Sequence, residues 1–147
     1  RRIMIRLELK TAEIDKALSG IKSGIKNPRP AFNKIAEYEV GEAKNRIRTT
    51  KVDPEGKPWK AWSYTTMMQR SKFGPSRGLL YRSGALLRSF DFKVTNSKVT
   101  ITNTKSYAPY LQEGTDNMPA RPFLGWGKDS DKNATSAFIE YFKRKMK

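Results

Sequence analysis

The sequence contains neither cysteine nor histidine, and these two absences exclude much active-site chemistry. Without cysteine there is no disulfide, no thiolate nucleophile and no thiolate metal ligand. Without histidine there is no Ser-His-Asp or Cys-His centre and no imidazole ligand for a metal. The sequence also lacks the glycine spacing of a phosphate-binding loop. We therefore expect neither an enzyme nor a protein with a metal or other cofactor.

Long apolar runs are also missing. No run approaches the roughly 18 residues that a membrane-spanning helix needs. The first residues alternate between apolar and charged, unlike the apolar core of a signal peptide. We therefore expect no membrane partner. A chain of 147 residues is long enough for one domain with its own core, which we assign to residues 1–147.

Acidic residues are scarce, and their distribution is uneven. The chain has 30 lysine and arginine residues against 14 acidic ones, a net charge of +16. Residues 56–90 contain no acidic residue at all. This charge predicts an anionic partner, which could be nucleic acid, an acidic protein surface or a membrane headgroup layer. The cations expected at such contacts are Lys57, Lys60, Arg70, Lys72, Arg77, Arg82 and Arg88.

The first third of the chain predicts one strand and two helices. Residues 3–9 alternate between apolar and polar, which is typical of a half-buried strand. Residues 14–25 carry one apolar helical stripe, and a second helix is predicted to begin at Pro30. The apolar face of this second helix comprises Phe32, Ile35, Ala36, Val40, Ala43 and Ile47. Its other face is expected to carry most of the charged residues Glu37, Glu39, Glu42, Lys44, Arg46 and Arg48.

The rest of the chain predicts a long loop, a hairpin and a final helix. Residues 51–78 are expected to be irregular, with a turn at Asp53–Gly56, and residues 79–87 to form a short helix. Alternating apolar residues from Phe90 to Ile101 predict a β-hairpin. One or two helical turns closed by Gly114 follow, and a helix over about 130–146 ends the chain. The fold class is therefore α+β, an antiparallel sheet with helices mainly on one side and a long irregular basic loop.

Four motifs occur in a characteristic order. They are Asp53-Pro-Glu-Gly-Lys-Pro-Trp59, then Thr65/Thr66, then Leu80-Tyr-Arg-Ser-Gly-Ala-Leu-Leu-Arg-Ser89, and last Tyr107-Ala108 followed by Gln112-Glu-Gly114 and Pro119-Ala-Arg-Pro-Phe-Leu-Gly125. In this order, over about residues 30–147, the chain resembles the phage virion morphogenesis, or tail completion, family. The chain departs from the family at Leu111, where members often carry a histidine.

The resemblance implies a non-enzymatic virion protein that completes or terminates a phage tail and joins it to the head and neck. It implies assembly as a ring, expected to be a hexamer, and a location at the head–tail junction or tail end after assembly in the host cytoplasm. The implied partners are further copies of the chain and the tail tube, tail terminator, connector or neck proteins, with packaged DNA as a further candidate. The residues expected at subunit or partner contacts are Trp59, Trp62, Gly84, Leu86, Tyr107, Tyr110, Gln112, Arg121 and Phe123.

An alternative hypothesis is a nucleic-acid-binding module. The aromatic residues interleaved with cations in residues 56–90 would stack on bases while the cations follow the phosphates. No zinc finger can form without cysteine and histidine, and no aromatic box of an RNA-recognition motif is present. We favour aromatic residues that anchor the fold and cations that meet an acidic protein. A third hypothesis, a hydrolase, would need an active centre built without histidine or cysteine.

Overall fold

The structure is a computed structural model that describes residues 5–10, 27–72 and 78–145. The predicted helix over residues 14–25 and the predicted loop residue Arg77 lie outside the described residues. The described elements, in chain order, are β1 (Ile5–Lys10), α2 (Arg29–Asn45), the π-helical turn η2 (Arg46–Thr50), α3 (Tyr64–Ser71), the 3-10 turn η3 (Leu87–Ser89), β2 (Phe90–Val94), β3 (Lys98–Asn103), α4 (Ala108–Glu113) and α5 (Ser130–Lys145).

The three described strands form one antiparallel sheet in the order β1-β3-β2. The central strand β3 places Ile101 opposite Leu7 of β1 and Phe92 of β2. Alternate residues of β3 are buried, so one face of the sheet faces the core. The turn between β2 and β3 is closed by Thr95, whose backbone N–H donates to the carbonyl of Lys98 at 2.9 Å. The predicted hairpin is confirmed.

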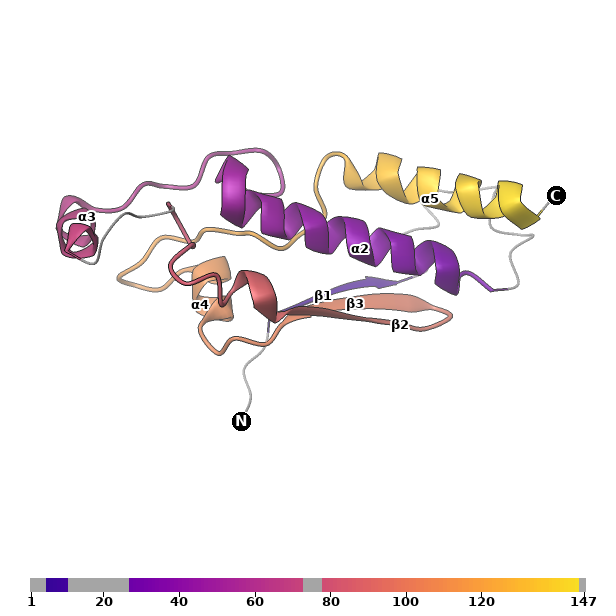
Figure 1. Cartoon of the computed structure of the whole chain (residues 1–147), viewed down its shortest axis with the longest axis horizontal. Helices are drawn as coiled ribbons and strands as arrows, with labels where there is room; N and C mark the ends of the chain where they lie inside the picture. Colours follow the sequence, from indigo (N-terminus) through magenta and orange to yellow (C-terminus); the bar gives the residue numbers. More distant parts are fainter. Residues whose placement is uncertain (1–4, 11–26, 73–77, 146–147) are drawn as a thin grey trace.

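Two long helices cover the buried face of the sheet (Figure 1). α2 packs on β2 and β3, and α5 packs along α2. Phe32 on α2 meets Phe138 on α5 edge to face, with ring centroids 5.7 Å apart. All six residues of the predicted apolar face of α2 are buried. The α+β class and the layer of helices on one side of the sheet are therefore confirmed.

Two charged residues predicted on the outer face of α2 are buried instead. Glu39 is 1% exposed and Arg46, at the start of η2, is 5% exposed. The chain between α4 and α5 covers Arg46, whose Nη1 donates to the carbonyl of Phe123 at 3.0 Å. α2 thus has a second covered side that its own periodicity does not show.

Two local predictions between the long helix and the hairpin were wrong. The irregular loop contains a helix, α3, because Ser63 caps it by accepting the backbone N–H of Thr66 at 3.3 Å. The helix expected over residues 79–87 is instead a series of turns that ends in η3. Leu80 and Gly84 adopt φ of +62° and +80°, and the left-handed region is incompatible with a continuous right-handed helix.

The last two helices agree with the predictions. α4 ends at Gly114, whose backbone N–H donates to the carbonyl of Tyr110 at 2.8 Å. α5 begins at Ser130, whose Oγ accepts the backbone N–H of Gly127 at 2.8 Å. In the described part of the chain, no helix is both long and apolar enough to cross a membrane.

Candidate functional site

The loop over residues 119–125 is fixed to α4 through its backbone. Gln112 on α4 accepts at Oε1 from the N–H groups of Phe123 and Leu124, each at 3.1 Å, and donates from Nε2 to the carbonyl of Leu124 at 2.7 Å. Gly114 allows the loop to approach, since a Cβ there would lie 2.6 Å from a backbone nitrogen of the loop. The loop is therefore a rigid part of the fold.

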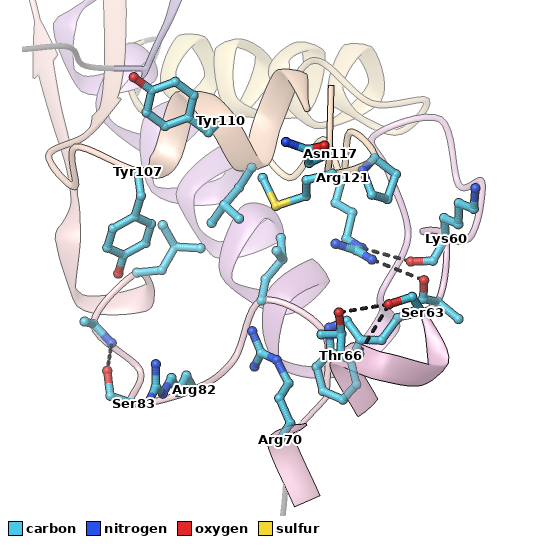
Figure 2. A pocket seen from close by; sticks show the side chains of 18 of the residues that line it. Lys60, Ser63, Thr66, Arg70, Arg82, Ser83, Tyr107, Tyr110, Asn117 and Arg121 are labelled. Carbon is cyan, nitrogen blue, oxygen red and sulfur yellow. Dashed lines mark hydrogen bonds between the residues drawn. The ribbon is translucent and has the colours of Figure 1, made fainter. Parts of the chain in front are cut away.

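Arg121, at the centre of this loop, holds the segment that leads into α3. Its Nε donates to the carbonyl of Lys60 at 2.9 Å and its Nη2 to the carbonyl of Ala61 at 3.3 Å (Figure 2). The side chain is 5% exposed. Burial, and to a lesser degree repulsion from Arg70, lowers the pKa of this guanidinium. A guanidinium stays charged in proteins, so the two carbonyls replace part of its water shell.

Two further side chains tie the loop to the body of the subunit. Trp59 Nε1 donates to the carbonyl of Pro122 at 2.8 Å, and Arg46 Nη1 donates to the carbonyl of Phe123. Phe123 is fully buried and meets Phe90 of β2 edge to face, with centroids 5.9 Å apart. The loop therefore packs against the sheet of its own subunit.

α3 extends from this anchored segment and buries none of its side chains. Tyr64, Met67 and Met68 are 73%, 49% and 47% exposed. Figure 1 shows α3 at one end of the molecule, beyond the end of α2. The guanidinium of Arg70 lies 4.6 Å from the centroid of the Trp62 ring, a cation–π contact that holds the second turn of α3 to its own linker. α3 is thus fixed in direction while its apolar side chains face water.

A cleft of about 1140 Å³ lies between α3, the segment that precedes η3, and α4 with its following loop (Figure 2). Its described lining includes no acidic residue. Tyr107 and Tyr110, 43% and 48% exposed, stand on the α4 side. The cations of its lining come from three separate segments and are Lys60, Arg70, Arg82 and Arg121. The cleft can accept an anionic group flanked by apolar or aromatic surface.

The wall of the cleft over residues 80–86 is held by a buried amide. Asn103, the last residue of β3, is fully buried, and its Nδ2 donates to the carbonyl of Leu86 at 2.8 Å. Gly84 has a φ of +80°, and a Cβ there would lie 2.9 Å from Nη1 of Arg88. The wall therefore keeps a defined shape relative to the sheet.

The nine predicted contact residues fall into two groups. Tyr107 and Tyr110 are exposed at the cleft, and Trp62 and Gln112 are half-buried. The other five are buried inside the domain, namely Trp59, Gly84, Leu86, Arg121 and Phe123. Of these, Gly84, Leu86 and Arg121 also contribute to the lining of the cleft. Contact of any of the nine with another subunit or partner stays a prediction.

The predicted cations only partly converge. Lys60, Arg70 and Arg82 all line the cleft, at separate places around it (Figure 2). Lys57 instead forms an exposed ion pair with Glu55 at 3.2 Å. Arg88 donates from Nη1 to the carbonyl of Ser83 at 3.3 Å, and Lys72 is exposed after the end of α3. The structure thus divides one acid-free stretch of sequence into a cleft group and scattered surface charges.

Sequence reasoning missed three features of this region. The apolar face of α3 went unrecognised because its helix was not predicted, although Ser63 is a residue type favoured at helix N-caps. The buried Arg46 left no local signal. Nor did Glu39, neither of whose carboxylate oxygens has a hydrogen-bond partner among the described residues. Burial raises the pKa of Glu39, against opposing contributions from nearby Ser130 and Arg46.

The arrangement of the acidic residues and the likeness to a protein family limit the possible functions of this site. The described residues include no group of three or more acidic side chains that could hold a metal ion. The model of the phage virion morphogenesis family matches residues 9–143. Neither a curated protein nor a solved structure gives a significant match.

Proposed function

This chain belongs to the phage virion morphogenesis family, and on that premise we propose that it completes or terminates the tail and joins it to the head and neck as a ring of identical subunits. The family makes it a bacteriophage virion protein that interacts with other virion components. The finer assignment, to the tail end or head–tail junction and to a ring that is expected to be hexameric, is our proposal.

The observation that carries the proposal is the exposed apolar face of α3. A helix of eight residues is marginal in water by itself, because the cost of nucleation is recovered only over longer helices. α3 also exposes three large apolar side chains, Tyr64, Met67 and Met68, on one helical face. Contact with a neighbouring molecule would remove this face from water. In a ring, each subunit meets the next through two different surfaces, so each copy both offers and covers such a face.

The proposed partners follow from this placement. They are further copies of the chain, and the tail tube, terminator, connector or neck proteins above and below the ring. The cationic cleft adds a surface for acidic groups of such neighbours. We propose a structural role without catalysis.

Complementation of a phage that lacks this gene tests the proposal. The double variant Met67→Lys/Met68→Lys places charge on the α3 face without touching the core, so the subunit should fold while heads and tails remain separate in electron micrographs. Ser136→Lys, at an exposed position on α5, is the matched control and should restore complete particles. Normal particles with the double variant would show that the apolar face of α3 is not needed to join heads to tails.

Nucleic-acid binding is a second candidate, favoured by the cationic cleft with Trp62, Tyr107 and Tyr110 in its lining. Trp59, expected to stack on bases, is 7% exposed and hydrogen-bonded, so it is not available for stacking. A salt titration distinguishes the two functions. Tight DNA binding by the isolated subunit, with a steep loss of affinity as salt rises, would support the second candidate over the first.

A further inference from the structure

We infer that the cleft of one subunit receives the acidic corner of a second copy of this chain, an inference that rests on the proposed ring. The acidic corner is defined here as five acidic residues around the turn before Trp59 and the start of α5. They are Glu42, Asp53, Glu55, Asp129 and Asp131. The inference names the two surfaces that would meet at each subunit boundary.

The acidic corner is built by close packing of two loops. Pro54 lies against the chain before α5, because a Cβ on Gly125 would come within 2.7 Å of its Cγ, and one on Gly127 within 2.8 Å of its carbonyl oxygen. Asp53 Oδ1 accepts the backbone N–H groups of Glu55 at 2.9 Å and Lys57 at 2.8 Å, which fixes the turn. Glu42 of α2 joins Asp53 and Asp129 in the lining of a hollow at this corner, so acidic residues of three segments lie close together.

The charges of the two surfaces are complementary. In a chain of net charge +16 with 14 acidic residues, three of them line this hollow, and Glu55 and Asp131 each lie two residues beyond one of these three. The neighbouring cations offset this charge only in part: Lys57 pairs with Glu55, and Arg46 and Lys128 share the lining of the hollow, which leaves five acidic residues against three cations. The described lining of the cleft has cations and no acid. Complementary potentials of this kind set register and suppress wrong pairings.

Apolar surface is also present on both sides. The lining of the cleft includes the apolar side chains Leu80, Leu111 and Met118. The acidic corner carries Pro54 and Trp126, both half-buried, between its charges. A protein surface can cover the apolar side chains of the cleft, whereas a nucleic acid duplex would supply phosphates but little apolar surface. A second copy therefore fits the site better than a nucleic acid duplex.

The positions of the two surfaces favour a head-to-tail contact. The cleft and the hollow at the acidic corner share no lining residue. α3 lies at one end of the molecule, while the start of α5 lies above the middle of α2 (Figure 1). Two different surfaces on one subunit generate a heterologous contact, which closes into a ring when the rotation between neighbours permits.

Reciprocal charge reversal tests the pairing. The cleft variant is Lys60→Glu/Arg82→Glu, and the corner variant is Glu55→Lys/Asp129→Lys. All four residues are exposed, so circular dichroism and the thermal midpoint should match those of the wild type. Each variant alone presents like charges at every boundary, and we expect its self-association to weaken at least about tenfold. Sedimentation velocity measures this against the wild-type chain.

An equimolar mixture of the two variants is the decisive sample. Each boundary between unlike variants again joins opposite charges, so assembly should return to the wild-type level with the two kinds of subunit alternating. Native mass spectrometry of subunits with different mass tags shows whether the two variants alternate in the assembly.

The inferred pairing would be overturned if the mixture did not assemble, or if either variant alone assembled as the wild type does. A ring could still form through other surfaces in that case. A wild-type chain that stays monomeric at high concentration would overturn the second copy as occupant. Binding of a DNA oligonucleotide at the cleft of that monomer would then assign the surface to nucleic acid.

Discussion

α2 and α3 are helices of one chain that are held in place by different means. α2 buries its entire predicted apolar face between the sheet and α5. α3 buries none of its side chains. Its direction is set by hydrogen bonds to the segment that precedes it, chiefly those of Arg121. The first arrangement stabilises the fold, and the second leaves an apolar surface exposed to water. A helix whose position is fixed but whose apolar face is uncovered is better explained by assembly than by folding.

The largest effect should come from damage to α2. Phe32→Ala removes a fully buried ring from the contact with Phe138 and should lower the free energy of unfolding by about 3–5 kcal/mol. Met67→Ala on α3, the control, should change it by less than about 0.5 kcal/mol in the isolated subunit. Urea unfolding of both variants measures the difference. A large loss from Met67→Ala would mean that α3 belongs to the core.

The second prediction concerns the hydrogen bonds that hold the segment before α3. Arg121→Met removes both hydrogen bonds to the carbonyls of Lys60 and Ala61 and should cost about 2 kcal/mol. Amide exchange in α3 should rise with it, because the linker loses its anchor. Lys60→Met is the control, since only its carbonyl is used and its side chain is exposed. Equal exchange in the two variants would show that the helix is positioned by other contacts.

These differences follow the range of the interactions involved. The buried face of α2 and the hairpin were predictable because their periodicities are local. Glu39 and Arg46 were placed on the wrong face because the chain that covers them is distant in sequence. The partners of Arg121 are backbone carbonyls some 60 residues away, which no residue type reveals. The motif Pro-Ala-Arg-Pro-Phe-Leu-Gly drew attention to Arg121, but only the fold shows what it holds.

A third prediction concerns Glu39, a buried residue of α2 whose carboxylate oxygens have no hydrogen-bond partner among the described residues. Burial raises the pKa of Glu39 above the ordinary value of about 4.5. The folded state therefore holds its proton to higher pH than the unfolded state, and stability is lost as the pH rises from about 4.5 through the raised pKa. Glu39→Gln cannot ionise and should gain on the order of 1 kcal/mol over the wild type at neutral pH.

The pH dependence supplies the check on this third prediction. Below about pH 4 the two proteins should differ little, because the wild-type carboxyl is protonated in both states. Glu37→Gln, at an exposed position two residues earlier on the same helix, is the control and should leave the pH profile unchanged. A gain that persists unchanged at low pH would point to altered packing rather than to loss of a buried charge.

The smallest effect is expected from Ser63→Ala, which should weaken α3 and leave α2 unchanged. The substitution removes the cap of α3 and should cost that helix about 1 kcal/mol, equivalent to roughly fivefold faster local opening. Global unfolding should hardly change, since α3 contributes nothing to the core. Thr65→Ala, on the same helix but outside the cap, is the control for amide exchange.

The same pair of variants then distinguishes a free α3 from a covered one. In the isolated subunit, Ser63→Ala should exchange faster over residues 64–71 than Thr65→Ala. In the assembled ring, a neighbour that packs on Tyr64, Met67 and Met68 should protect the helix in both variants, because opening would then also break the subunit contact. If the fivefold difference survived assembly unchanged, α3 would still face water in the ring, and its exposed apolar face would need another partner.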